Sequence, residues 1–163
     1  MSTVGLPAQI RRLADEKLQV TLALSLHAPN DTLRKQLIPW AKRVSIDDLV
    51  GVCNYYFART GRELTLEYVL LGGLNDSVQD ARQLAAIARR MRGNVNLLRY
   101  NPVAELPFRR PASQTVQLFL GALRAAGVNA HVRRSRGLDI DSACGQLKHR
   151  TDLSSDSLCK QAT

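Results

Sequence analysis

The feature that most constrains the fold of this chain is a regular alternation of short apolar runs with helical patterns. Each connection between successive apolar runs is long enough for the crossover that parallel strands require. The sequence therefore predicts an α/β fold built on a parallel sheet. The predicted strands are Val20–Leu26, Leu64–Leu71, Val95–Tyr100 and Ala130–Arg133, and the predicted helices are Leu6–Lys17, Leu33–Ile38, Ile46–Ala58, Val78–Met91 and Ser113–Ala126.

Side chains that terminate helices support these ranges. Ser45 and Asp48 form a capping-box pattern, Ser77 is a second N-cap, and Asn30 or Asp31 caps the short helix. Gly61 and Gly127 follow two helices at the position where glycine ends them. The strands read as nearly continuous apolar runs, which predicts a sheet covered on both faces. Four strands cannot close an eight-stranded barrel, so the fold is a small open sheet or part of a larger barrel.

The composition favours a polyanionic partner. The chain has 163 residues, about one domain, and 23 basic residues against 14 acidic ones give a net charge of +9. Eighteen of the basic residues are arginine, which matches phosphate geometry and stacks on bases. Nucleic acid is the simplest partner for this charge, and a solvated basic surface is the alternative.

The cysteines do not indicate a disulfide framework or a metal site. The three of them, Cys53, Cys144 and Cys159, lack metal-ligand spacing. Cys53 lies on the apolar face of a predicted helix and is expected in the core, whereas Cys159 lies in a polar tail, residues 149–163, that we expect to be disordered. With no signal peptide and no membrane-length apolar run, the expected location is the cytoplasm.

Polar and small residues cluster after the predicted strands, where parallel α/β proteins place their sites. Ser25 and His27 end one strand, and alternation predicts that they share a face, although a structural histidine is the alternative. Gly72-Gly73 suits close approach to a ligand or a turn. Asn101-Pro102 indicates a turn whose asparagine also suits an adenine or carboxylate edge.

Cys144 is a candidate nucleophile. Ala143 and Gly145 leave it sterically open, and three arginines upstream favour its thiolate, although Asp139 and Asp141 oppose that effect. The residues alone leave nucleophile and bystander equally open, and no nearby catalytic triad decides between them.

Several short motifs occur in order along the chain. They are Ser2-Thr3-Val4-Gly5, Leu24-Ser25-Leu26-His27-Ala28-Pro29-Asn30-Asp31, Glu67-Tyr68-Val69-Leu70-Leu71, Asn75-Asp76, Val95-Asn96-Leu97-Leu98, Tyr100-Asn101-Pro102, Arg133-Arg134-Ser135-Arg136-Gly137 and Ala143-Cys144-Gly145-Gln146-Leu147. This ordered series resembles the C-terminal portion of the radical S-adenosylmethionine (SAM) RNA methyltransferases. Those enzymes modify carbon 2 of an adenine in large-subunit ribosomal RNA and some transfer RNAs, and a related branch modifies carbon 8.

The resemblance implies a fold and a set of roles. It implies the C-terminal half of a partial (β/α)6 barrel over residues 1–148, beginning at the end of the third barrel strand and closing with an extra strand. The matched positions imply SAM contacts and a cysteine that carries a methyl group from one SAM while a second SAM, cleaved at a 4Fe-4S cluster, generates the radical. The expected SAM contacts are Ser2, Ser25, Leu26, His27 and Asn101, the methyl carrier is Cys144, and the RNA contacts are Arg133, Arg134 and Arg136.

The chain also departs from the family pattern. It holds no C-x-x-x-C-x-x-C cluster motif, and neither Cys53 nor Cys159 matches the resolving cysteine. We therefore expect a fragment whose N-terminal half is a missing partner and which is inactive alone. A non-catalytic RNA-binding remnant is the alternative, and an unrelated α/β enzyme with a cysteine nucleophile is a third hypothesis.

Overall fold

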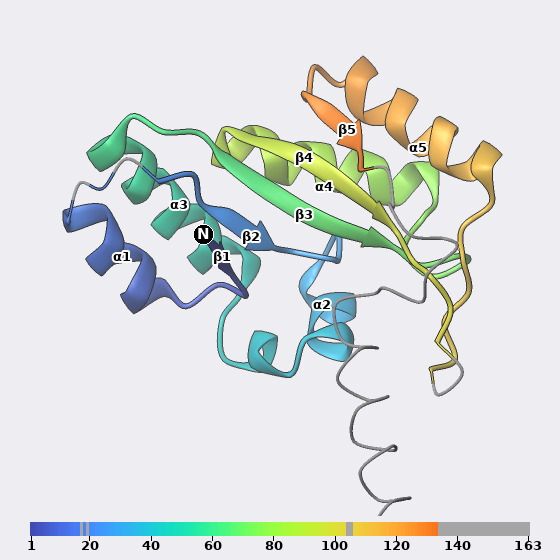
Figure 1. The fold of residues 1–163 in the computed structure, drawn as a ribbon, viewed down its shortest axis with the longest axis horizontal. Helices are drawn as coiled ribbons and strands as arrows, with labels where there is room; N and C mark the ends of the chain where they lie inside the picture. Colours follow the sequence, from blue (N-terminus) through green and yellow to red (C-terminus); the bar gives the residue numbers. More distant parts are fainter. Residues whose placement is uncertain (17, 19, 104–105, 134–163) are drawn as a thin grey trace, which may run out of the picture. The chain divides into compact units, whose positions relative to one another are not determined.

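The computed structural model describes residues 1–16, 18, 20–103 and 106–133, which form five parallel strands and their connecting helices (Figure 1). Strands and helices alternate along the chain as the sequence predicted. The strands are β1 Ser2–Thr3, β2 Ala23–Ser25, β3 Leu64–Leu70, β4 Gly93–Arg99 and β5 Ala130–Val132; the helices are α1 Pro7–Asp15, α2 Asp31–Leu37, α3 Ile46–Thr60, α4 Val78–Met91 and α5 Ser113–Ala125, with a 3-10 turn at Pro39–Lys42.

Local capping explains most of the helix boundaries. The Ser45 hydroxyl accepts a hydrogen bond from the Asp48 N–H at 3.1 Å, and the Asp48 carboxylate accepts the Ser45 N–H at 2.9 Å. The same reciprocal pair starts α4 at Ser77. Gly61 ends α3 with φ = 67°, a conformation that costs glycine little. The predicted capping box and both serine N-caps are confirmed.

The strands lie in sequence order, β1-β2-β3-β4-β5, and every neighbouring pair is parallel. The predicted α/β class and parallel sheet are therefore confirmed. Hydrophobic patterning missed β1, because two residues are too few to show a pattern. The family resemblance did imply the end of a strand at this position.

One face of this sheet carries several polar side chains and is only half-buried among the described residues, which by themselves do not cover both faces as predicted. Alternate residues of β3 are buried, from Leu64 to Leu70, while Thr65, Glu67 and Val69 between them are only half-buried. The buried residues face the layer of helices, in which α1 packs beside α3, α3 beside α4 and α4 beside α5. The run Leu64–Leu71 looked nearly continuous in the sequence because Thr65 and Val69, which are common in strands, lie between its buried residues.

The core between the sheet and the helices is mainly aliphatic, in keeping with an aromatic content of 5%. Tyr68 and Phe119 are its largest aromatic pair, with ring centroids 5.5 Å apart. Cys53 is fully buried in the same core, which confirms its predicted place. No helix in the described part of the chain is long and apolar enough to span a membrane.

Candidate functional site

The carboxyl ends of β2, β3 and β4 meet at one edge of the sheet, and the segments after them are joined by hydrogen bonds. The strand β2 ends at Ser25, two residues before His27, and β3 is followed by a turn at residues 71–75. Residues 100–103 leave β4 at the same edge. This is the edge at which parallel α/β folds place ligands.

Asn75 joins the ends of β2 and β3. Its side chain is fully buried, donates to the carbonyls of His27 at 2.9 Å and Val69 at 2.8 Å, and accepts the Leu71 N–H at 2.7 Å. The Tyr68 hydroxyl donates to the Asn75 carbonyl at 2.9 Å. Every hydrogen-bonding group of this carboxamide is used, so Asn75 fixes the edge rather than offering a group to a ligand.

His27 is held as a neutral ring. Its Nδ1 accepts the Val69 N–H at 3.2 Å, so in the neutral ring the hydrogen is on Nε2. Burial, together with the smaller effect of the nearby Arg34 guanidinium, lowers the pKa of His27 to about 4. The ring therefore presents one N–H donor and no positive charge at neutral pH.

His27 does not share a strand face with Ser25, so that prediction is wrong. The strand ends at Ser25, and the backbone at His27 is left-handed, with φ = 57°. A non-glycine residue in this region is uncommon and marks a position that its surroundings hold in place. Here the N–H groups of Leu26 and His27 both donate to the Glu67 carbonyl, and this pairing turns the chain off β2.

A row of polar side chains crosses the open face of the sheet. The strand register pairs Ser25 with Glu67 and Glu67 with Asn96. The Asn96 amide donates to both carboxylate oxygens of Glu67, at 3.1 and 3.0 Å. Sequence analysis singled out Ser25 but missed Glu67 and Asn96 as members of this row. The signal was present, since both occupy the alternate positions of runs that are otherwise apolar.

Unpaired polar atoms are concentrated at the end of β4. Asn101 Oδ1 and the Tyr100 hydroxyl are buried and lack a hydrogen-bond partner among the described residues. A buried acceptor without a partner is costly, so such atoms mark places where a ligand or water completes the site. Asn101 Oδ1 suits a ligand N–H group such as the amino group of an adenine. This chemistry fits the adenosyl part of SAM.

Sequence analysis also missed Arg34, a fully buried cation beneath the same edge. Its guanidinium donates to the carbonyls of Val4, which follows β1, at 2.8 Å and of Val44, which precedes α3, at 3.3 Å. Burial lowers the pKa of Arg34, and the charge of Asp31 opposes that effect. Arg34 thus holds the end of β1 to the start of α3. The available signal was an arginine on the inward face of a short helix, four residues before Ile38.

The Gly72-Gly73 pair forms a turn, the second of the two predicted alternatives. The Gly72 N–H donates to the Arg109 carbonyl at 2.7 Å, and a Cβ at Gly72 would lie 2.8 Å from the Arg110 carbonyl oxygen.

Of the predicted RNA contacts, Arg133 follows β5 and is exposed. Arg134, Arg136 and Cys144 lie outside the described residues, so their predicted roles stay predictions.

Comparison with known proteins identifies homologues of this chain. Over 148 residues the chain is 52% identical to a probable dual-specificity RNA methyltransferase RlmN of Thermosynechococcus vestitus, and the match covers 91% of this chain and 44% of that protein. A protein of the same name from Acaryochloris marina is 47% identical over 148 residues. The chain is homologous to the C-terminal portion of the radical SAM RNA methyltransferases. No protein-family model matches the chain.

Solved structures agree with this homology. A radical SAM methyltransferase from Sphaerobacter thermophilus superposes with a TM-score of 0.84 at 49% identity, over 89% of this chain and 42% of that one. A domain of pyruvate-formate lyase-activating enzyme from Bacteroides vulgatus shares the fold, with a TM-score of 0.62 at 14% identity. The chain spans less than half the length of the RNA methyltransferases that it matches.

The described residues fit SAM better than they fit an iron–sulfur cluster. They include no group of three histidine, cysteine or acidic side chains placed to hold a metal. Cys53, the cysteine within the described ranges, is buried in the core, and burial raises the pKa of its thiol to about 12. A thiol of this kind is a poor ligand, because ligation requires the thiolate. The described residues therefore offer no set of ligands suited to a cluster.

Proposed function

We propose that this chain is the SAM-binding and RNA-facing C-terminal part of a methyltransferase that modifies carbon 2 of adenine in ribosomal and transfer RNA, in the cytoplasm. The observation that carries the proposal is Asn101 Oδ1, which is buried at the carboxyl edge and has no hydrogen-bond partner among the described residues. The family resemblance in the sequence matches this asparagine to a SAM contact. Ser2, Ser25, Leu26 and His27 complete the proposed SAM contacts. Bound SAM would supply the methyl group, and a second SAM, cleaved by one electron from the reduced cluster, would supply the radical.

The chain's own residues bind and orient in this proposal. Neutral His27 donates through Nε2 to an acceptor of SAM, and Asn101 Oδ1 accepts from its adenine. Asn75 and Arg34 keep the ends of β1, β2 and β3 in place behind these groups. We further propose that the Cys144 thiolate carries the methyl group to the RNA.

We propose that a segment N-terminal to these residues supplies the 4Fe-4S cluster and the resolving cysteine, and that the 163 residues alone do not methylate RNA. No C-x-x-x-C-x-x-C motif occurs in the sequence, which supports this division of roles. Among the described strands β1 pairs with β2 alone, and its other edge suits such a segment.

The test compares the chain alone with the chain supplied with the cluster-bearing part of a homologue. Both are reconstituted anaerobically and given SAM and a one-electron reductant. Transfer RNA and a ribosomal RNA fragment are digested after reaction, and methyladenines are separated by mass spectrometry. We expect 2-methyladenine with both parts and none with either part alone. Product from the chain alone would refute the division of roles, and 8-methyladenine would refute the proposed carbon.

The same test decides the second candidate, a non-catalytic RNA-binding remnant, which the missing cluster motif favours. A remnant would bind RNA in the presence of the cluster-bearing part and yield no methylated base. The two candidates share the fold and the basic charge, so binding alone does not separate them.

A further inference from the structure

The segment between β4 and α5 carries arginines to the carboxyl edge of the sheet, and the proposed function does not assign them a role. We propose that Arg109 and Arg110 form a phosphate-binding strap that holds the RNA backbone beside the site. The inference rests on the proposed RNA substrate and adds the surface that holds it.

The strap is fixed to the end of β3. The Gly72 N–H donates to the Arg109 carbonyl at 2.7 Å, and the Arg110 carbonyl lies so close to Gly72 that a Cβ there would sit 2.8 Å from it. Phe108 packs edge-on against Tyr100, with centroids 5.9 Å apart and planes at 88°. These contacts place the backbone of the two arginines before any ligand arrives, which lowers the entropic cost of binding.

The charged groups of the strap remain available. Both arginine side chains are exposed, and neither forms an ion pair within 4.0 Å in the part of the chain that the structure describes. The nearest acidic group in the turn, Asp76, accepts the Gly73 N–H at 2.9 Å. Several other arginines in the molecule are paired, for example Arg59 with Asp15 at 3.0 Å. Unpaired, exposed guanidinium groups on a fixed backbone suit phosphate.

Further arginines continue the same edge. The strand register places Arg99 beside Leu70, two residues before Gly72, and the Arg133 N–H donates to the Leu97 carbonyl on β4. Arg99 has a buried Nε with no partner in the described ranges and only a long contact, 3.5 Å, from Nη1 to the Ser113 hydroxyl. The edge from β3 to β5 therefore carries a strip of four arginines, Arg109, Arg110, Arg99 and Arg133. Charge of one sign along an edge favours a polyanion.

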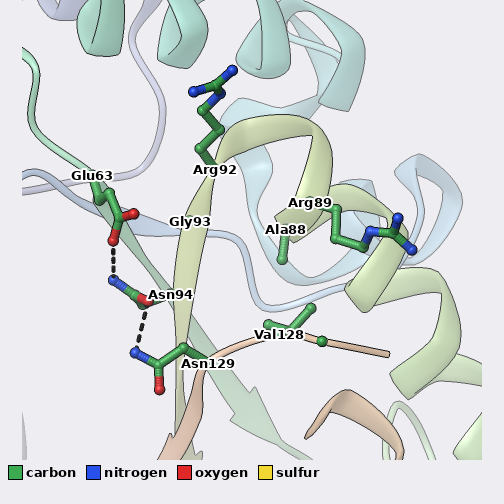
Figure 2. Close-up of a pocket in the computed structure, with 9 residues that line it drawn as sticks. Glu63, Ala88, Arg89, Arg92, Gly93, Asn94, Val128 and Asn129 are labelled. Atoms are coloured by element: carbon green, nitrogen blue, oxygen red, sulfur yellow. Dashed lines mark hydrogen bonds between the residues drawn. The ribbon is translucent and has the colours of Figure 1, made fainter. Parts of the chain in front are cut away.

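The opposite edge of the sheet supplies a matched control. A pocket of about 220 Å³ lies at the amino ends of β3, β4 and β5. Figure 2 shows Glu63, Asn94 and Asn129 joined there by a chain of hydrogen bonds. Arg89 and Arg92 line this pocket and are exposed. Replacing them removes the same charge as replacing the strap arginines, but at the edge away from the proposed site.

The experiment measures the affinity of the full chain for an unmodified transfer RNA transcript across a series of salt concentrations. The double variant Arg109→Gln/Arg110→Gln should bind roughly tenfold more weakly, with a slope of log affinity against log salt smaller by about 1.5, because two phosphate contacts are lost. Arg89→Gln/Arg92→Gln should stay within about twofold of the parent at moderate salt. Arg109→Lys/Arg110→Lys, which keeps the charge, should recover most of the salt slope.

Gly72→Ala separates the position of the charge from its amount. It keeps the net charge but displaces the strap, so it should weaken binding, whereas Gly121→Ala, in open space on α5, should leave binding unchanged. Circular dichroism and thermal unfolding confirm that each variant is folded.

Three outcomes of the RNA-binding measurements overturn the inference. They are equal losses at the two edges, no loss at the strap, and no RNA binding by the parent chain. Equally tight binding of poly-glutamate would show a surface for acidic protein instead and would also overturn it. Methyladenine formation in the two-part assay tests the proposed function separately, so the strap can fail while that function stands.

Discussion

Replacing Asn75 by alanine should be among the most damaging single substitutions at the candidate site. The change removes two donors and one acceptor that serve the His27 carbonyl, the Val69 carbonyl and the Leu71 N–H. Asn75 is fully buried, so water reaches these groups only through the cavity left by the carboxamide. Leaving one buried polar group unsatisfied costs about 1–3 kcal/mol. A water molecule in the cavity would offset part of the total for three groups.

We therefore expect Asn75→Ala to lower the free energy of unfolding by about 3–5 kcal/mol, a large share of the roughly 5–15 kcal/mol typical of a domain. Urea unfolding followed by circular dichroism measures the difference. Asn54, an exposed residue of α3, provides the control, and Asn54→Ala should be neutral or slightly stabilising because alanine favours helix.

Asn75→Asp sharpens the same test. It keeps an acceptor for the Leu71 N–H but turns a carboxylate toward the His27 and Val69 carbonyls, so at neutral pH it should destabilise at least as much as alanine. A loss below about 1 kcal/mol for Asn75→Ala would refute the reasoning, since it would mean that the three partners find other hydrogen bonds.

Three further predictions concern other parts of the fold. The folded state keeps His27 neutral down to about pH 4, whereas the unfolded state takes up its proton near pH 6.5. The contribution of His27 to the free energy of unfolding should therefore be present above pH 6.5 and be lost as the pH falls towards 4. The loss should be at most roughly 3 kcal/mol. Subtracting the pH profile of His27→Gln isolates this contribution, and parallel profiles would contradict it. Cys53 should resist iodoacetamide at pH 8 in the native chain and react in denaturant, since burial raises the pKa of its thiol to about 12. If peptide mapping finds Cys53 alkylated in the native chain, its place in the core is wrong. Gly72→Ala should lower the free energy of unfolding by about 1–3 kcal/mol through overpacking against Arg110. Gly51→Ala on α3 should raise it by about 0.5–1 kcal/mol. Equal effects in thermal or urea unfolding would show that the strap backbone moves away to accommodate the new Cβ.

Local chemistry made much of the fold predictable from the sequence. Ser45 and Ser77 carry their partners three residues away, so the sequence contains both halves of each capping box. The strand β3 was predicted to within one residue, because Gly72 follows directly. The polar face of the sheet was not predicted, since the apolar residues Val69 and Leu98 lie on it and hide the alternation.

The candidate site was predictable only in outline. The edge itself follows from parallel topology, and it led to Ser25, His27 and Asn101. The groups that hold the edge could not be found in this way, because Asn75 bonds to His27, 48 residues away, and Arg34 bonds to Val4, 30 residues away. Long-range partners of this kind depend on the folded arrangement of strand ends, which a pattern of single residues does not contain.

The measurement that tests the proposed function most directly is peptide mass mapping of the chain after incubation with SAM and the cluster-bearing part of a homologue. We predict a gain of one methyl group on Cys144, its absence when the cluster-bearing part is omitted, and its absence in Cys144→Ala. Methylation that maps to another residue would contradict the account. Formation of methylated RNA by the Cys144→Ala variant would contradict it as well.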